Sequence, residues 1–125
     1  MTAPLTPATL YVTQDVIRAY GDLTNDFNPI HLDPDFAART PMGGVIAHGT
    51  MSICLLWQAL FRSFGADRFA DLALDVRFVK PVRIGETLTA GGQPGAEPGV
   101  YDVWVRGDDG SDRVAGTVRP GAASA

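Results

Sequence analysis

The sequence contains one cysteine, Cys54, and no cluster of basic residues. A single cysteine excludes an intrachain disulfide framework and any zinc or iron–sulfur site built from several thiolates, and it fits a reducing compartment. Ten Lys and Arg against 14 Asp and Glu give a formal net charge of −4, which argues against a nucleic-acid partner or an anionic membrane surface. The expected partners are small molecules or other proteins.

The sequence also lacks an uninterrupted apolar run. Residues 40–61 carry no formal charge, but Pro41 and three glycines break them up, and a membrane span needs about 20 apolar residues. Residues 1–7 show no basic segment followed by an apolar core, as a signal peptide would. We therefore expect no membrane association, no secretion and a cytoplasmic location.

The length and composition predict one domain. The 125 residues are 46% hydrophobic and 19% charged, which is ordinary for a globular protein with a single core. No internal repeat or linker divides the chain. We expect the domain to span residues 1–120 and the small residues of 121–125 to form a disordered tail.

The amino-terminal half predicts helices. Apolar residues recur at helical spacing after Thr13, a candidate N-cap, at Val16, Ile17, Tyr20 and Leu23. A turn is expected at 28–29 and another short helix from 33–37.

Residues 48–64 predict a long central helix that is apolar on every side. Gly65 is a natural C-cap, and Arg62 complements the helix dipole. A helix of this kind must be buried on nearly all faces.

The carboxyl-terminal half changes to a period of two, which is typical of strands. Strands are expected at 72–79, 88–90, 101–105 and 114–118, with a hairpin turn at 108–110. The order predicts an α+β domain in which an antiparallel sheet wraps around the central helix. Because one small sheet can hardly cover that helix, we expect a homodimer or a higher homo-oligomer.

Two polar segments carry groups suited to chemistry. Asp26, Asn28 and His31 surround Pro29, and a carboxylate with an imidazole can hold and activate one water by general acid–base catalysis. At the start of the central helix, the amide of Gly49 offers a donor that a substrate oxygen can approach without hindrance from a β-carbon. Together these groups could form an acid–base pair and an oxyanion site.

Structural roles are the alternative for each group. Asp26 and Asn28 could make an Asx turn, His31 could be a satisfied polar residue, and His48 could be an N-cap or core histidine. A zinc site is disfavoured because no His-x-His or His-Glu-x-x-His spacing occurs. Cys54 is expected to be core packing, and the serines lack a nucleophile context.

Three segments resemble the MaoC-like, (R)-specific enoyl-CoA hydratases, which have the hot dog fold. Residues 23–34, LTNDFNPIHLDP, resemble the hydratase motif of that family. His48-Gly49-Thr50 resembles the His-Gly-Met that opens its central helix, and residues 78–88 resemble its later Phe-x-x-Pro-Val-x-x-Gly-Asp-x-Leu segment. The strands after Gly99 match only in pattern.

The resemblance implies a single hot dog domain that adds water across a trans-2-enoyl-CoA thioester, or removes it in reverse. Asp26 and His31 would be the catalytic pair, and the Gly49 amide would bind the thioester oxygen. Asn28, His48 and Thr50 would bind or orient the substrate. No metal or redox cofactor is implied, because coenzyme A is part of the substrate.

The chain departs from the family pattern at three positions. Asn25 stands where many members have Gly, and Thr50 replaces Met. Trp57 replaces a small residue of the acyl pocket, so we expect the indole to shorten or reshape that pocket.

Two other functions stay open: a hot dog thioesterase and a noncatalytic subunit of a heteromeric hydratase. No Asp or Glu lies between Asp35 and Asp67, whereas thioesterases of this fold usually carry an acid on the central helix. Retention of both Asp26 and His31 argues against a noncatalytic subunit.

Overall fold

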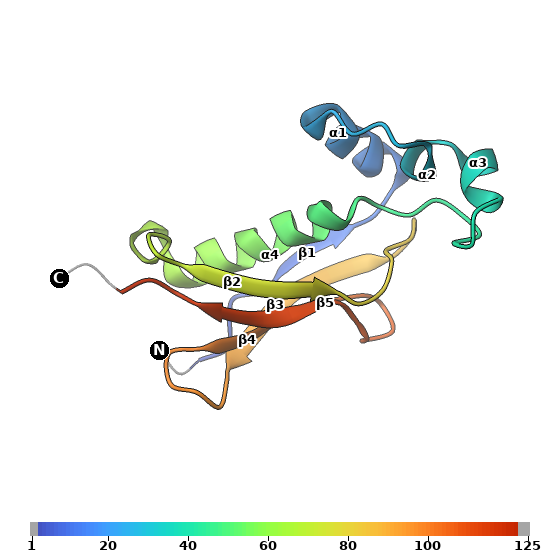
Figure 1. The fold of residues 1–125 in the computed structure, drawn as a ribbon. Coiled ribbons are helices and arrows are strands. Elements are labelled where there is room, and N and C mark those ends of the chain that lie inside the picture. The colour runs from blue at the N-terminus through green and yellow to red at the C-terminus, as the bar shows by residue number, and fades with distance from the viewer. Residues whose placement is uncertain (1–2, 123–125) are drawn as a thin grey trace.

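Within residues 3–122, which this computed structural model describes, five antiparallel strands form one sheet in the order β1-β3-β4-β5-β2 (Figure 1). The strands are β1 (Ala8–Tyr11), β2 (Ala73–Phe78), β3 (Thr87–Pro94), β4 (Tyr101–Arg106) and β5 (Asp112–Arg119). β1 and β2 are therefore the two edges of the sheet.

A long helix lies across one face of the sheet, and three short helices lie together beyond its amino-terminal end (Figure 1). The helices are α1 (Gln14–Thr24), α2 (Pro29–Leu32), α3 (Pro34–Ala38), α4 (Gly49–Phe64) and the 3-10 helix η1 (Ala66–Arg68). The predicted α+β architecture, with a sheet wrapped around a central helix, is confirmed.

Helix α4 packs its sheet-facing side into the core. Leu55, Leu56, Ala59 and Leu60 are at most 2% exposed and pack with apolar side chains of the strands. The prediction that this helix is buried on nearly all faces is wrong for a single chain, because Cys54 is exposed and Phe61 is 53% exposed. One sheet covers only one side of the helix.

Helix α1 begins as predicted. Thr13 is its N-cap, and the Thr13 hydroxyl accepts a hydrogen bond from the Val16 amide at 3.0 Å. Ile17 is fully buried, but Leu23 is 81% exposed and does not belong to the core. The helix therefore contacts the rest of the fold mainly through its first two turns.

Three elements differ from the prediction. Strand β1 is not predicted from the sequence. It follows a proline-rich segment, and its four residues are too few to show a clear alternation of apolar and polar side chains. Asn28 and Pro29 begin the short helix α2 where a turn was expected. Strand β3 continues beyond residue 90, through Gly91 and Gly92. Glycine is needed at position 92 because a β-carbon there would lie 2.5 Å from the carbonyl oxygen of Asp102.

Gly121 does not belong to the predicted disordered tail. Gly121 is buried, its amide donates to the carbonyl of Arg68 at 2.8 Å, and its carbonyl accepts from Nε of Arg68 at 2.9 Å. Residues 123–125 of that tail lie outside the described residues.

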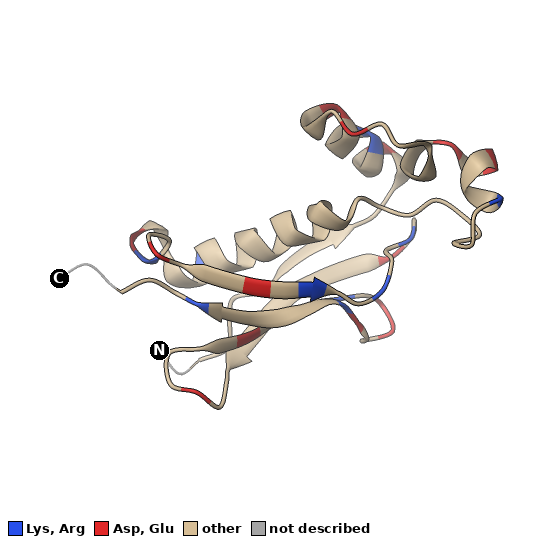
Figure 2. Ribbon diagram, viewed as in Figure 1, with Lys and Arg blue, Asp and Glu red and all other residues tan. Residues whose placement is uncertain are grey.

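Charged residues are spread over the fold. In the view of Figure 2, Lys and Arg lie on several separate elements, while acidic residues mark α1, α3 and the β4–β5 turn. Among residues 3–122, no helix is both long enough and apolar enough to cross a membrane.

Candidate active site

The segment between α1 and α2 carries the predicted hydratase motif. Asn25 ends α1 with φ of 57°, in the left-handed region, and its amide donates to the Gly21 carbonyl. Asparagine adopts this conformation more readily than most residues, so it can replace the glycine that many family members have here. The chain reverses at this point, which brings Asp26 back toward α1.

Asn28 and Pro29 then set the position of His31. The side-chain oxygen of Asn28 accepts from the Ile30 amide at 3.1 Å and caps α2, and Pro29 occupies the first helical position. The carbonyl of His31 accepts from the Gln14 side chain at 3.0 Å, which ties α2 to α1. Asn28 therefore makes the cap that was the structural alternative for it, and its role toward substrate stays a prediction.

The imidazole of His31 is held in one tautomer. Its Nδ1 lies 2.7 Å from the carbonyl oxygen of Ile46. A carbonyl oxygen can only accept, so Nδ1 carries the hydrogen and Nε2 of the neutral ring carries a lone pair. His31 therefore presents a proton acceptor.

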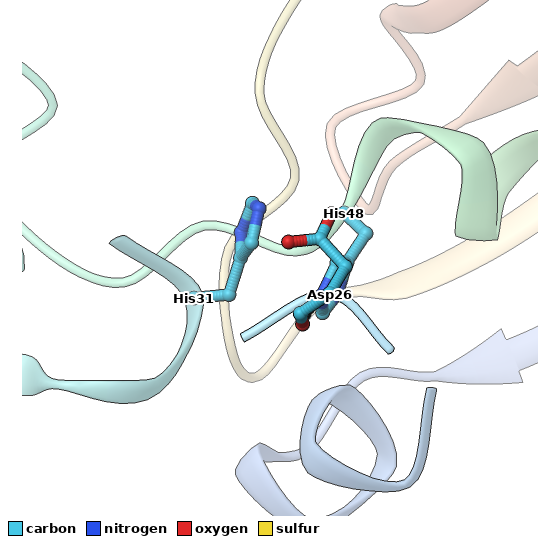
Figure 3. Close-up of side chains that lie close together, drawn as sticks. All are labelled: Asp26, His31 and His48. Atoms are coloured by element: carbon cyan, nitrogen blue, oxygen red, sulfur yellow. Dashed lines mark hydrogen bonds between the residues drawn. The ribbon is translucent and has the colours of Figure 1, made fainter. Parts of the chain in front are cut away.

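Asp26, His31 and His48 come together, as Figure 3 shows. One donor atom from each lies within 4.8 Å of the others. A carboxylate oxygen of the exposed Asp26 accepts from the Asn28 amide at 3.3 Å, so the loop orients this carboxylate. The predicted pair of Asp26 and His31 is thus a spatial pair.

His48 is the N-cap residue of α4 and is only 2% exposed. Its ring stacks on that of His31, with centroids 4.0 Å apart and planes inclined by 29°. Its Nε2 lies 3.0 Å from the main-chain carbonyl oxygen of Asp26. His48 is thus an N-cap residue by position and is buried, as the structural alternative expected, although its ring makes no capping hydrogen bond to the helix.

The three side chains offer a carboxylate and two imidazoles, which suit proton transfer and could also hold a metal ion. Nδ1 of His31 and Nε2 of His48 each lie at hydrogen-bond distance from a main-chain carbonyl oxygen. At most one nitrogen of each ring is therefore left for either role.

A cavity of about 330 Å³ opens between the amino-terminal end of α4 and the segment after β2. His31, Gly49 and Ser52 line it from one side, and Phe78, Lys80 and Arg113 are among its other lining residues. The Gly49 amide belongs to the first helical turn, whose N–H groups have no intrahelical acceptor. A donor with partial positive charge therefore borders the same cavity as the His31 ring.

Gly49 has little free space on its side of the cavity. A β-carbon built there would lie 2.9 Å from Cε1 of Phe78, whose ring packs over this glycine. A glycine is therefore required for the present position of the Phe78 ring.

Of the predicted site residues, His31 and Gly49 line this cavity; Asp26, Asn28 and His48 lie beside His31 without lining it, and Trp57 and Thr50 lie elsewhere. Trp57 lines a separate cavity with Phe61 and Phe69, so it does not border the His31 cavity in this chain. Thr50 does not line that cavity either; its hydroxyl oxygen accepts from the Tyr20 hydroxyl at 2.7 Å.

Tyr20 is a site neighbour that the sequence pattern indicated only as an apolar helix position. Its ring lies 5.1 Å from that of His48, and burial raises the pKa of its hydroxyl. Gly21, next to it, gave no sequence signal at all. A β-carbon at Gly21 would lie 2.9 Å from the carbonyl oxygen of Asp26.

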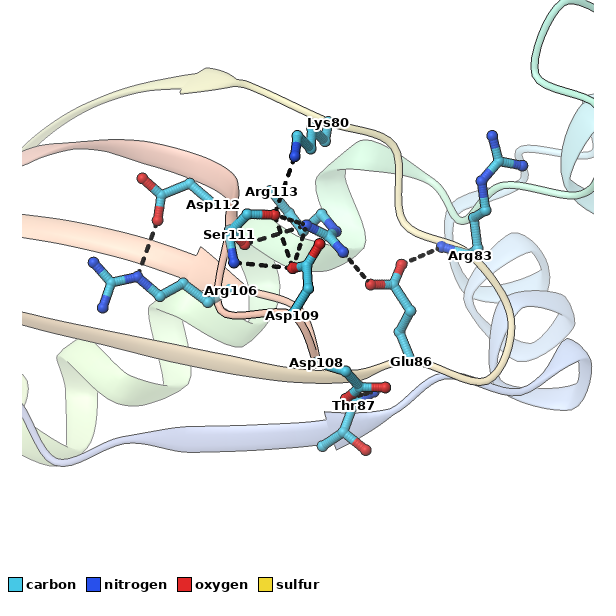
Figure 4. Close-up of polar contacts among 10 residues, drawn as sticks. All are labelled: Lys80, Arg83, Glu86, Thr87, Arg106, Asp108, Asp109, Ser111, Asp112 and Arg113. Carbon is cyan, nitrogen blue, oxygen red and sulfur yellow. Dashed lines mark hydrogen bonds and ion pairs between the residues drawn. The ribbon is translucent and has the colours of Figure 1, made fainter.

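Arg113 is a buried charge in the wall of the cavity, anchored by the network in Figure 4. Its guanidinium donates to Glu86 at 2.5 Å and to Asp109 at 3.3 Å. Burial opposes its charge, but the hydrogen bond and charge of Glu86, with those of Asp109, raise the pKa of Arg113. The sequence pattern gave no indication of this network, because Arg113 lies on a strand between charged and apolar neighbours.

Comparison with known proteins points to one family. The family described as MaoC like domain matches residues 2–96. The chain is 35% identical over 83 residues to 3-hydroxyacyl-thioester dehydratase Z of Mycobacterium tuberculosis, covering 63% of this chain and 55% of that protein. It is 35% identical over 74 residues to the (R)-specific enoyl-CoA hydratase of Aeromonas caviae, covering 59% and 55%.

The fold also has solved counterparts. R-Hydratase PhaJ1 from Pseudomonas aeruginosa superposes with a TM-score of 0.79 at 22% identity, over 97% of this chain and 82% of that one. The matched segments span about half the length of the curated relatives.

Proposed function

Because the chain belongs to the family of MaoC-like domains, whose pattern matches residues 2–96, we propose that it hydrates trans-2-enoyl-CoA thioesters to (R)-3-hydroxyacyl-CoA, or catalyses the reverse dehydration. The observation that carries this proposal is the arrangement at the cavity. A ring nitrogen of His31 and a carboxylate oxygen of Asp26 lie within 4.8 Å of each other, Nδ1 of His31 lies against the Ile46 carbonyl, and the Gly49 amide borders the same cavity as His31.

The reaction needs a proton acceptor, a proton donor and an oxyanion site. Water attacks C3 of the enoyl thioester while its proton passes to the pair of His31 and Asp26, and the π electrons move toward the thioester oxygen. The Gly49 amide stabilises that enolate-like oxygen. The pair then returns a proton to C2, and delivery from the same side gives syn addition.

His31 and Asp26 make different hydrogen bonds, and these suggest different roles for the two residues. The Nδ1 hydrogen of His31 is held by Ile46, so only Nε2 can take the proton from water. The Asp26 carboxylate accepts the Asn28 amide through one oxygen and keeps further acceptor capacity for the second hydrogen of that water. We therefore assign the general base to His31 and water orientation to Asp26.

The proposal requires neither a metal nor a redox cofactor, because coenzyme A belongs to the substrate. It includes a second copy of the chain, since the exposed apolar side of α4 around Phe61 is unsuited to water.

The test uses crotonyl-CoA and longer enoyl-CoAs and follows loss of the conjugated enoyl absorbance, with free thiol measured in parallel. We expect hydration without thiol release and an (R)-3-hydroxyacyl product on chiral analysis. Thiol release without hydration would favour the thioesterase alternative and overturn the proposal. Asp26→Asn should lower the hydration rate by roughly 10²-fold or more.

A further inference from the structure

His48 connects the two halves of the site. It lies at the start of α4, adjacent to Gly49, and it contacts both members of the acid–base pair. Nε2 lies 3.0 Å from the main-chain oxygen of Asp26, and one face of the ring stacks on His31 at 4.0 Å. One side chain thus contacts the loop of Asp26 and the ring of His31 together.

The hydrogen bond fixes the tautomer of His48. The Asp26 carbonyl can only accept, so Nε2 carries the hydrogen and Nδ1 carries a lone pair. Nδ1 is buried, and within residues 3–122 it has no hydrogen-bond partner.

Close neighbours surround His48. A β-carbon on Gly21 would lie 2.9 Å from the Asp26 carbonyl oxygen and at an ordinary contact distance of 3.6 Å from Cε1 of His48. The titratable groups that face His48 are His31 by stacking, Tyr20 by a ring contact at 5.1 Å, and Asp26, whose carboxylate lies within 4.8 Å of a His48 ring nitrogen and whose main-chain oxygen accepts from Nε2.

We propose that His48 is a positioning residue of the hydration site: it fixes Asp26 through the Nε2 hydrogen bond and packs its ring against that of His31. The inference rests on the proposed function. The stacked ring holds the His31 imidazole in the orientation in which its Nδ1 meets the Ile46 carbonyl, so the other ring nitrogen of His31 keeps its place for the proton of water.

Two substitutions separate the two contacts. His48→Gln keeps a side-chain N–H at the reach of Nε2 and removes the ring. His48→Phe keeps the ring and removes the donor. Because both contacts position the pair, we expect each variant to lose about 10²-fold in kcat for crotonyl-CoA hydration, with KM changed by less than about twofold.

The control is Gln93→Ala on the exposed surface of β3, which should match the unmodified chain. Circular dichroism and the melting temperature identify which variants are folded. A folded Gln or Phe variant with full kcat, or one whose loss lies in KM alone, would overturn the positioning role. Hydration by the unmodified chain would still stand in that case.

A second measurement does not depend on activity. Long-range ¹H–¹⁵N spectra of the unmodified protein should show the neutral His48 ring as the Nε2–H tautomer. A neutral ring that carries its hydrogen on Nδ1 would overturn the inference, even if no enoyl thioester is hydrated. Failure of the proposed function and failure of the inference are therefore distinguishable.

Discussion

At the scale of single residues, the chemistry depends on which nitrogen of His31 carries a hydrogen. The carbonyl of Ile46 binds Nδ1–H at 2.7 Å, and this leaves Nε2 free to accept a proton. Ile46 itself is held by a β-bridge to Arg83. In the proposed mechanism, the backbone therefore determines which nitrogen of His31 accepts the proton.

His31→Asn tests this arrangement with little change in structure. The asparagine amide can replace Nδ1–H in the bond to Ile46, but it has no equivalent of the Nε2 lone pair. We expect the hydration rate to fall by roughly 10² to 10⁴, while the melting temperature stays near that of the unmodified chain. A folded variant with the unmodified rate would show that His31 is not the base.

Gly49→Ala tests the approach to the oxyanion amide. The added methyl would lie 2.9 Å from the ring of Phe78, which is 60% exposed, so the methyl and the ring together should crowd the amide. We expect kcat/KM to fall, by up to the roughly 10²-fold that loss of one oxyanion donor costs.

The matched control is Gly44→Ala, whose methyl would meet Arg83 at an ordinary 3.6 Å and should leave kcat/KM unchanged. Adding Phe78→Ala to Gly49→Ala should restore part of the activity if crowding by the ring is the cause. An unaffected Gly49→Ala variant would argue against the amide as oxyanion donor.

At the scale of elements, the β4–β5 turn and the segment after β2 meet at Arg113. The side chain of Arg113 is 8% exposed and that of Glu86 is 16% exposed, whereas the surface pair Arg119–Glu97 is 54% and 67% exposed. Removing one partner of a buried pair leaves a charge without compensation, and removing one partner of an exposed pair leaves the other in water.

Glu86→Ala should therefore lower the free energy of unfolding by about 3 kcal/mol. Glu97→Ala should change it by less than about 1 kcal/mol. Urea denaturation at neutral pH measures both values. Equal effects of the two substitutions would mean that Glu86 is not needed to compensate Arg113.

The β4–β5 turn also predicts an acid dependence. Hydrogen bonds from Ser111, and then the charge of Arg113, lower the pKa of Asp109 from 3.8 to about 2. A carboxyl whose pKa is lowered on folding favours the folded state above its ordinary pKa, and that contribution is lost as the pH falls from 3.8 toward 2.

Asp109→Asn removes this titration but keeps an acceptor for Ser111. Because Asp109 is open to solvent, the effect should be small. Urea midpoints measured across the acid range should fall less steeply for the variant than for the unmodified chain. If the urea midpoints of the two proteins fell equally steeply with pH, Asp109 would not be the source of this acid dependence.

The elements differ in how far the sequence predicts them. Helix α4 and the pairing of Asp26 with His31 depend on local signals, namely helical periodicity and the cap formed by Asn28 and Pro29. The wall made by Phe78 and Arg113 could not be predicted, because it depends on strands paired across long sequence separations.

The position of Trp57 had a usable signal. At 100° per residue, Ser52 lies roughly 60° to one side of Gly49 and Trp57 roughly 80° to the other. Trp57 also lies eight residues beyond Gly49, roughly 12 Å along the helix axis, and of the two residues only Ser52 lines the Gly49 cavity. The effect of Trp57 on acyl-chain length stays a prediction. Trp57 would have to act from the separate cavity that it lines with Phe61 and Phe69.

At the scale of the whole molecule, one chain leaves an aromatic surface open on α4 and the segment that follows. The rings of Trp57 and Phe61 contact that of Phe69, with centroids 5.6 and 5.4 Å apart, and the three line a cavity of about 350 Å³. Phe61 is 53% exposed. Because water solvates such a surface poorly, a second copy is expected to cover it.

Phe61→Glu tests that expectation by placing a charge in the surface that a partner would cover. Sedimentation velocity should show a dimer or larger assembly for the unmodified chain and a shift toward monomer for the variant, because burying an unpaired carboxylate is costly. Leu23→Glu is the control, since Leu23 is 81% exposed at the far end of α1 and should leave assembly unchanged. If Trp57 reaches an acyl pocket through the partner copy, loss of the assembly should also change the chain-length preference in the hydration assay. A folded unmodified monomer with full hydration activity would show that the single chain is sufficient and that the aromatic surface serves another purpose.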